Sequence, residues 1–255
     1  MHSAVTTSIN RYFVAQMFLT RLPAPKSLRW SETELAASTV YFPVVGIVVG
    51  AVAACAWYAG AMLWSENIAA LLAVGVSIIT TGAFHEDGLA DSADGLGGAF
   101  EVSRKLHIMR DSRIGTYGSV VLIVVIMAKV FAISAIAPTS AAGALIAAHV
   151  MARWTSLPLI YNNVYVREEG TGKPFAATVT NQQLYTATAI TALVAIAATG
   201  VHAFIIIPLI TAFVWLAQWH LRKQLGGVTG DVLGAVNSLS ELLVYLVLSA
   251  SVFAM

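Results

Sequence analysis

Long apolar segments separated by short polar breaks dominate the chain from residue 40 onward. A helix needs about 20 residues to cross the hydrocarbon core of a bilayer. Seven segments have roughly that length: 40–64, 67–84, 118–137, 140–161, 184–201, 203–221 and 232–254. The pattern predicts an all-α integral membrane bundle of about seven spans, forming a single membrane-embedded domain over residues 1–255.

The pattern is less regular at two places. The break between the fifth and sixth segments, residues 200–203, contains His202 as its only polar side chain. These segments therefore form either a tight helical hairpin or one long segment with a re-entrant turn. Near the N-terminus, residues 8–22 have the pattern of an amphipathic helix that Pro23 and Pro25 would end. We expect this helix to lie at the membrane interface.

Composition supports the membrane interpretation. The chain is 58% hydrophobic and 11% charged, with a mean hydropathy of +0.78, which excludes a soluble domain with a polar surface. The net charge of +1 gives no sign of nucleic-acid binding. The single cysteine excludes an intrachain disulfide. The lipid bilayer is the expected partner, and the composition is compatible with a homo-oligomer.

Basic residues alternate between the connections. The N-terminal region, the 85–117 loop, the 162–183 loop and the residues after the sixth segment contain Lys or Arg, whereas the intervening turns contain none. Because cytoplasmic connections carry the excess of positive charge, the pattern predicts that the N-terminus is inside and the C-terminus outside in the cytoplasmic (inner) membrane. The long polar loops, and any active site on them, would then face the cytoplasm.

An acidic stretch, FHEDGLADSADG at 84–95, contains four of the thirteen acidic residues of the chain. If it is helical, Asp87, Asp91 and Asp94 share one face. Such a face repels itself unless a divalent cation binds, and hard oxygen ligands favour Mg²⁺ or Mn²⁺ over zinc. The neighbouring His85 would either contact the substrate or pack behind the acids.

Two further polar motifs follow. Arg110 and Arg113 precede Gly115 at the start of the third segment, an arrangement suited to phosphate oxygens; the alternative is an ordinary positively charged membrane boundary. The glycine-rich stretch at 225–235 contains Thr229 and Asp231. Asp231 would either contact a ligand or act as the N-cap of the last helix.

Charged residues also lie within the spans. Lys129 and Glu241 fall inside the third and seventh segments, and buried charges usually face a partner or a cavity. We expect these two side chains to form an ion pair. Arg153 lies nearer a membrane boundary, where it would reach toward the headgroups. His149, one turn earlier, is expected to be a hydrogen-bonded interior histidine.

The sequence resembles the cobalamin synthase family (adenosylcobinamide-GDP ribazoletransferase, or cobalamin-5′-phosphate synthase) over nearly its whole length. The matching motifs are FLTRLP at 18–23, FPVVG at 42–46, HxDGLADxxDG at 85–95, IMRDSRxGT at 108–116 and LGGxTGDxLGA at 225–235. Several long motifs in the same order make the resemblance specific. Glu86 occupies a position that varies in the family, and Ser238 stands where members often have a glutamate.

The resemblance implies a reaction. A hydroxyl of α-ribazole, or of its 5′-phosphate, would attack the phosphorus linked to cobinamide in adenosylcobinamide-GDP, and GMP would leave. Mg²⁺ would be held on the diphosphate by Asp87, Asp91 and Asp94, and Asp94 or Asp111 would act as general base. The candidate substrate- and phosphate-binding residues are His85, Arg110, Arg113, Gly115, Thr229 and Asp231.

Three rival functions fit parts of the pattern. A CDP-alcohol phosphotransferase also clusters aspartates, but its motif requires an arginine that the residues after Asp94 lack. A prenyltransferase of the UbiA type would favour two aspartate-rich segments, and only Asp231 marks a second one. A cation-coupled transporter would explain Lys129 and Glu241, but it would place its acidic residues nearer the membrane midplane.

Overall fold

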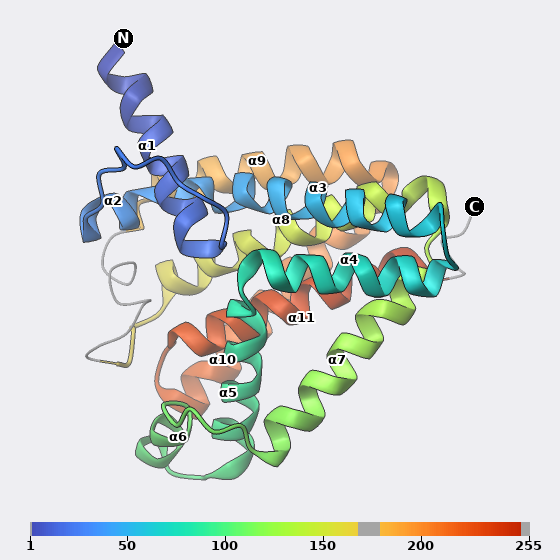
Figure 1. Cartoon of the computed structure of the whole chain (residues 1–255). Coiled ribbons are helices and arrows are strands. Elements are labelled where there is room, and N and C mark those ends of the chain that lie inside the picture. The colour runs from blue at the N-terminus through green and yellow to red at the C-terminus, as the bar shows by residue number, and fades with distance from the viewer. Residues whose placement is uncertain (1, 168–178, 251–255) are drawn as a thin grey trace.

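The computed structural model describes residues 2–167 and 179–250, and its regular elements are helices. The long helices are α1 (His2–Leu19), α3 (Phe42–Ala61), α4 (Glu66–Thr81), α5 (Phe84–Gly98), α7 (Thr116–Ser134), α8 (Pro138–Asn162), α9 (Asn181–Thr199), α10 (Ala203–Leu225) and α11 (Gly230–Ser249) (Figure 1). Short helices α2 (Glu32–Ala37), η1 (Ser38–Tyr41), α6 (Val102–Ile108) and η3 (Gly200–His202) connect them. The predicted all-α class is confirmed.

Close packing of α3 on α8 forms the centre of the bundle. A Cβ on Gly46 would lie 2.6 Å from the backbone oxygen of His149, and one on Gly50 would lie 2.6 Å from the Cα of Ile146. Such distances leave no room for a side chain, so these glycines let the two helix backbones approach. Figure 1 shows α8 surrounded by α3, α9 and α11.

All seven predicted segments contain helices, but fewer have the length and apolar composition of a membrane span. Within the described residues, five stretches are long and apolar enough to cross: Glu32–Ala61, Thr116–Ser134, Pro138–Asn162, Asn181–Leu225 and Gly230–Ser249. The bent pair α4–α5 would make six. The count is below seven because α4 has only 16 residues and because α9, η3 and α10 count as one continuous helical stretch.

Helices α9 and α10 form a tight hairpin, which is one of the two arrangements that the sequence allowed. Tyr161, at the end of α8, donates to the side-chain oxygen of Asn181 at 2.5 Å, where α9 begins. Arg222, near the end of α10, donates to the side-chain oxygen of Asn163 at 2.9 Å. The far ends of α9 and α10 therefore meet the same end of α8, so the chain reverses at Gly200, where φ is +56°.

The predicted 85–117 loop contains two helices. Helix α4 ends at Thr81 and α5 begins at Phe84, and the two helices are bent by 90° relative to each other. Gly82 and Ala83 both adopt left-handed backbone conformations, with φ of 66° and 58°, and this pair of unusual angles produces the sharp corner. The acidic stretch thus forms a helix outside the five candidate spans, and α6 follows it.

The N-terminal helix differs from its predicted extent. It covers His2–Leu19 rather than 8–22, and Thr20 closes its last turn by donating through both its N–H and its hydroxyl to the backbone oxygen of Gln16. Its C-terminal half is not merely interfacial, since Val14 and Ala15 are fully buried against the bundle.

Candidate active site at the crossing of α5 and α11

Helix α5 places its three aspartates on one face, but at different depths. Asp87 is exposed, Asp91 is half-buried and Asp94 is buried. The shared face follows from their i, i+4 and i+7 spacing once the segment is helical. The depths follow from the packing of the end of α5 against α7.

Asp94 binds the first turn of α7. One of its carboxylate oxygens accepts from the backbone N–H of Gly115 at 2.7 Å, and the other from that of Gly118 at 2.9 Å. Unpaired N–H groups and the helix dipole at a helix start favour a negative charge. The backbone of Gly115, expected to bind phosphate, is therefore bonded to Asp94.

The start of α11 lies directly against α5. A Cβ on Gly88 would come within 2.7 Å of the backbone oxygen of Asp231. One on Gly234 would lie 3.4 Å from the Cα of both Gly88 and His85. The glycines of the two motifs thus allow the helices to cross closely, and the crossing brings Asp231 beside the acidic face of α5.

Asp231 pairs with an arginine that the sequence did not single out. Arg167 directs both terminal nitrogens at the Asp231 carboxylate, one of them at 3.4 Å. The two side chains are only 10% and 17% exposed. In the sequence Arg167 is one basic residue of a connection that is predicted to be cytoplasmic, and its position gives no indication of this partner.

A short backbone bridge brings Arg167 to this place. The N–H of Val166 donates to the oxygen of Val228 at 3.0 Å, and the N–H of Val228 donates to the oxygen of Val164 at 2.9 Å. The segment after α8 is thereby bound to the glycine-rich stretch before α11. Gly227 is required there, because a Cβ would collide with the Val164 carbonyl.

Asp231 is not the N-cap of α11. That position belongs to Thr229, whose hydroxyl accepts from the N–H of Val232 at 3.4 Å and also donates to Asp231 at 3.4 Å. Thr229 is fully buried, so it shapes the start of α11 rather than presenting itself to a substrate. The capping alternative for Asp231 is therefore wrong, and its carboxylate is left to interact with Arg167 and the α5 acids.

The carboxylates of Asp87, Asp91 and Asp231 repel one another. Burial, followed by the charges of Asp87 and Asp231, raises the pKa of Asp91 to about 7. Among the described residues, no three His, Cys, Asp or Glu side chains converge as ligands around a metal ion would. The donor chemistry of Asp87 and Asp91 nevertheless fits a hard divalent cation, since carboxylate oxygens are its preferred ligands and a bound cation would relieve their repulsion.

The arginine motif after α6 is arranged differently from its predicted form. Arg113 binds Asp111 through two nitrogens, at 2.6 and 3.0 Å, and this pairing lowers the pKa of Asp111 to about 2. Both side chains line a cavity of about 520 Å³ that also includes Asp94. Arg110 is exposed and is not part of the lining of this cavity, so the two predicted phosphate-binding arginines do not act on one position.

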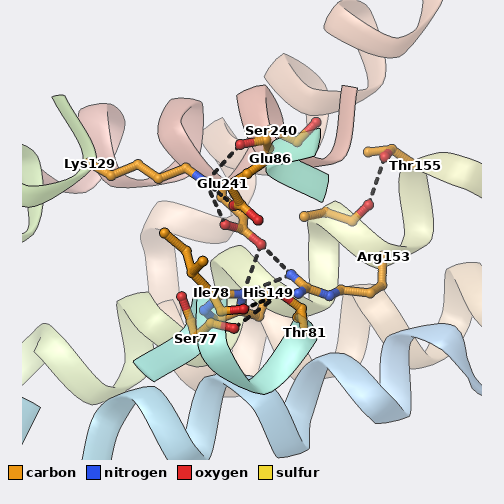
Figure 2. A network of polar contacts seen from close by, with 12 residues as sticks. Ser77, Ile78, Thr81, Glu86, Lys129, His149, Arg153, Thr155, Ser240 and Glu241 are labelled. Carbon is orange, nitrogen blue, oxygen red and sulfur yellow. Dashed lines mark hydrogen bonds and ion pairs between the residues drawn. The ribbon is translucent and has the colours of Figure 1, made fainter. Parts of the chain in front are cut away.

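Below the acidic helix lies a buried network of charges (Figure 2). The Lys129 ammonium is 2.8 Å from a carboxylate oxygen of Glu241, which confirms the expected ion pair. It also donates to Ser238 at 2.9 Å and lies 3.7 Å from Glu86 on α5. Lys129 therefore links α7 and α11 to the first turn of the acidic helix.

Arg153 belongs to the same network. It is 1% exposed and its guanidinium contacts Glu241, so the expectation that it reaches the headgroups is wrong. The ring of His149 lies 2.8 Å from the same carboxylate, in agreement with an interior hydrogen-bonded histidine. With His149 neutral, the two cations of the network are balanced by Glu86 and Glu241, as a buried set of charges requires.

His85 lies apart from the carboxylate cluster. It is 4% exposed, packs beside Phe84 and lines a small apolar pocket with Phe18 and Phe42. Because His85 and Asp87 are two residues apart on a helix, their side chains point in widely different directions. The structure therefore places His85 behind the acidic face, as the packing alternative anticipated.

Comparison with known proteins decides the family. Residues 11–249 match the family model described as cobalamin-5-phosphate synthase. The chain belongs to this family. A relative from Shewanella amazonensis, named adenosylcobinamide-GDP ribazoletransferase, is 39% identical over 254 residues, covering 96% of this chain and 97% of the relative. A Vibrio cholerae protein of the same name is 37% identical, covering 98% and 97%. No solved structure matches.

Membership of the cobalamin synthase family confirms the resemblance found in the motifs and identifies the chain as an enzyme, a transferase. Three of the five motifs, those at 85–95, 108–116 and 225–235, meet around the α5–α11 crossing or the adjacent cavity. The crossing is therefore the candidate active site of this family member.

Proposed function

We propose that the chain joins α-ribazole, or its 5′-phosphate, to adenosylcobinamide-GDP and releases GMP. The observation that carries the proposal is the meeting of Asp87 and Asp91 on α5 with Asp231 on α11, beside Arg167. Acidic groups for a cation, next to a guanidinium for a phosphate, are the parts that a phosphoryl transfer needs. The proposed substrates are inferred from the family and from the names of its members.

The transfer exchanges one bond to phosphorus for another. The ribazole hydroxyl oxygen bonds to the phosphorus that carries the cobinamide side chain, and the bond from this phosphorus to the anhydride oxygen breaks. GMP leaves with the electron pair of that bond, and the hydroxyl proton passes to a base. Because little covalent chemistry falls to the protein, positioning and charge neutralisation account for most of the catalysis.

Mg²⁺ is the cation that we propose. It would be held by Asp87 and Asp91, with Asp231 nearby, and would supply charge neutralisation at the diphosphate. Asp94 would contribute less than predicted, since both of its oxygens already accept backbone hydrogen bonds. Arg167 is bound to Asp231 and is placed to contact a phosphate beside that carboxylate.

Asp111 is poorly suited to act as the general base, and Asp94 remains the other candidate. The pKa of Asp111 is lowered to about 2 by its hydrogen bonds to Arg113, and so weak a base takes up a hydroxyl proton poorly. Asp94 lies one turn beyond Asp91 on α5, within the same acidic face. The proposed setting is the cytoplasmic face of the inner membrane, with the N-terminus inside and the C-terminus outside.

The test is turnover by the purified chain in lipid nanodiscs. Supplied with adenosylcobinamide-GDP, α-ribazole and MgCl₂, it should release GMP and cobalamin in equal amounts, and a chelator should abolish the reaction until Mg²⁺ is restored. Absence of both products with Mg²⁺ present would overturn the function. Full turnover in excess chelator would overturn only the proposed role of Mg²⁺.

A further inference from the structure

The cavity beyond the end of α5 has the size of a small-molecule binding site. It has a volume of about 520 Å³ and lies between α5, α6, the following loop and the start of α7. Its lining includes Asp94, Gly98, Arg104, His107, Asp111, Arg113 and Tyr117. Asp94 also ends the acidic face of α5, so the cavity begins where the proposed diphosphate site stops.

Helix α6 presents Arg104 and His107 to this cavity. Lys105 and Met109 are i and i+4 and both are buried, with the Lys105 ammonium bonded to the side-chain oxygen of Gln224. This bond fixes α6 to the end of α10. Arg104 and His107 are exposed and share the opposite side of the short helix, so anchoring one face of α6 orients the other toward the cavity.

The aromatic side of the cavity is Tyr117. Its side chain is 56% exposed. A Cβ on Gly97 would lie 3.1 Å from both Cγ and Cδ1 of the ring, so the ring rests on the backbone of α5 only because residue 97 is glycine. A ring supported on one side and open on the other is a platform on which a nucleobase can stack.

The charges of the cavity match a nucleotide. Arg104 has no ion-pair partner within the part of the chain described, and so it is available to a phosphate. The Asp111 carboxylate accepts three hydrogen bonds from Arg113, but the Arg113 side chain is 87% exposed, so the N–H groups of a ligand can replace those of Arg113. Guanine presents two adjacent N–H donors on its Watson–Crick edge, which a carboxylate can accept together, whereas adenine does not present such a pair.

We propose that this cavity binds the guanosine nucleotide half of the substrate: Arg104 and His107 hold its phosphate, Tyr117 stacks on the base and Asp111 selects guanine. The inference rests on the proposed function, because it assigns a place to the GMP that this reaction releases. It assigns a specificity role, rather than a proton-transfer role, to Asp111.

The test is equilibrium binding of GMP and AMP to the full chain in nanodiscs, without the second substrate. Arg104→Gln and Tyr117→Ala should each weaken GMP binding at least about tenfold, and Tyr117→Phe, which keeps the ring, should bind nearly as well as wild type. Asp111→Asn should lose the preference for GMP over AMP. Matched controls are Lys223→Gln and Tyr185→Ala, which alter a cation and an exposed tyrosine on α10 and α9.

Binding and turnover separate the two proposals. If wild type forms product but GMP affinity is unchanged in both Arg104→Gln and Tyr117→Ala, the cavity assignment fails while the function stands. A GMP preference retained in Asp111→Asn removes the guanine-selecting role. If GMP binds as expected but neither product forms, the proposed function fails and the nucleotide site stands. Circular dichroism of each variant identifies a folding defect, and Tyr117→Phe then decides the role of the ring.

Discussion

Gly88 on α5 lies against the backbone of Asp231 at the start of α11, so that a Cβ on Gly88 would come within 2.7 Å of the Asp231 carbonyl oxygen. The two residues are far apart in the chain and belong to different motifs. Their contact joins the acidic helix to the glycine-rich stretch, and the candidate active site depends on it.

Replacing Gly88 by alanine should separate the two helices. The new methyl group would meet backbone rather than a flexible side chain, so α5 or α11 must move. We expect turnover to fall at least about tenfold, since misplaced catalytic groups lose that much readily, together with a lower melting temperature. Gly75→Ala on α4 is the control, because nothing lies within 4 Å of its Cβ position. Equal behaviour of the two variants would contradict the role of the crossing.

Asp231→Asn tests whether α11 contributes to the chemistry. Because Thr229 caps the helix, the change should leave the helix start intact. It removes the charge that faces Arg167 and Asp91, so we expect turnover to fall and the Mg²⁺ concentration for half-maximal rate to rise. Steady-state kinetics at varied Mg²⁺ measure both. A variant with normal rate and normal Mg²⁺ dependence would place Asp231 outside the site.

The buried network should respond to charge balance more than to the loss of any single contact. Lys129→Met leaves Glu86 and Glu241 with only Arg153 as counter-ion, and breaking such a buried pair typically costs about 3–5 kcal/mol. The double variant Lys129→Met plus Glu86→Gln restores one cation and one anion. We therefore expect it to unfold at a higher temperature than Lys129→Met alone. A double variant as unstable as the single one would show that Glu86 does not share the charge.

Asp91 should make the metal-free protein sensitive to pH. Its pKa is raised from 3.8 to about 7, so the folded state holds the proton more tightly than the unfolded state. This contribution to stability is complete below pH 3.8 and is lost as the pH rises through about 7. Thermal unfolding in chelator should therefore show a decline over this range that Asp91→Asn lacks. Mg²⁺ should offset the decline in wild type, and an identical pH profile for the two proteins would contradict the proposed repulsion.

Sidedness can be tested with single cysteines. Cys55, the only native cysteine, is exposed and would first be replaced by serine. Ser112→Cys in the connection after α6 and Thr139→Cys at the start of α8 both lie at exposed positions. In intact cells an impermeant maleimide should label the second but not the first. The reverse result would invert the proposed topology.

Much of the architecture follows from local sequence. The apolar segments were predictable as helices because burial in lipid and internal hydrogen bonding both depend on residues near in sequence. The acidic face was equally predictable, since Asp87 and Asp91 share it as soon as the segment is helical. The corner at Gly82 and Ala83 was missed because nothing in the sequence requires a left-handed alanine.

Which charged side chains pair with one another was decided by the tertiary structure alone. The sequence determined that Lys129, Arg153 and Glu241 are charged and lie within apolar segments, but only the packing of α7, α8 and α11 brings both cations to the Glu241 carboxylate. In the same way, Arg167 meets Asp231 through a backbone bridge that has no sequence signal. Helical periodicity acts over a few residues, whereas a charge pairs with whichever opposite charge the packed backbones place within reach, and that distance is a property of the fold.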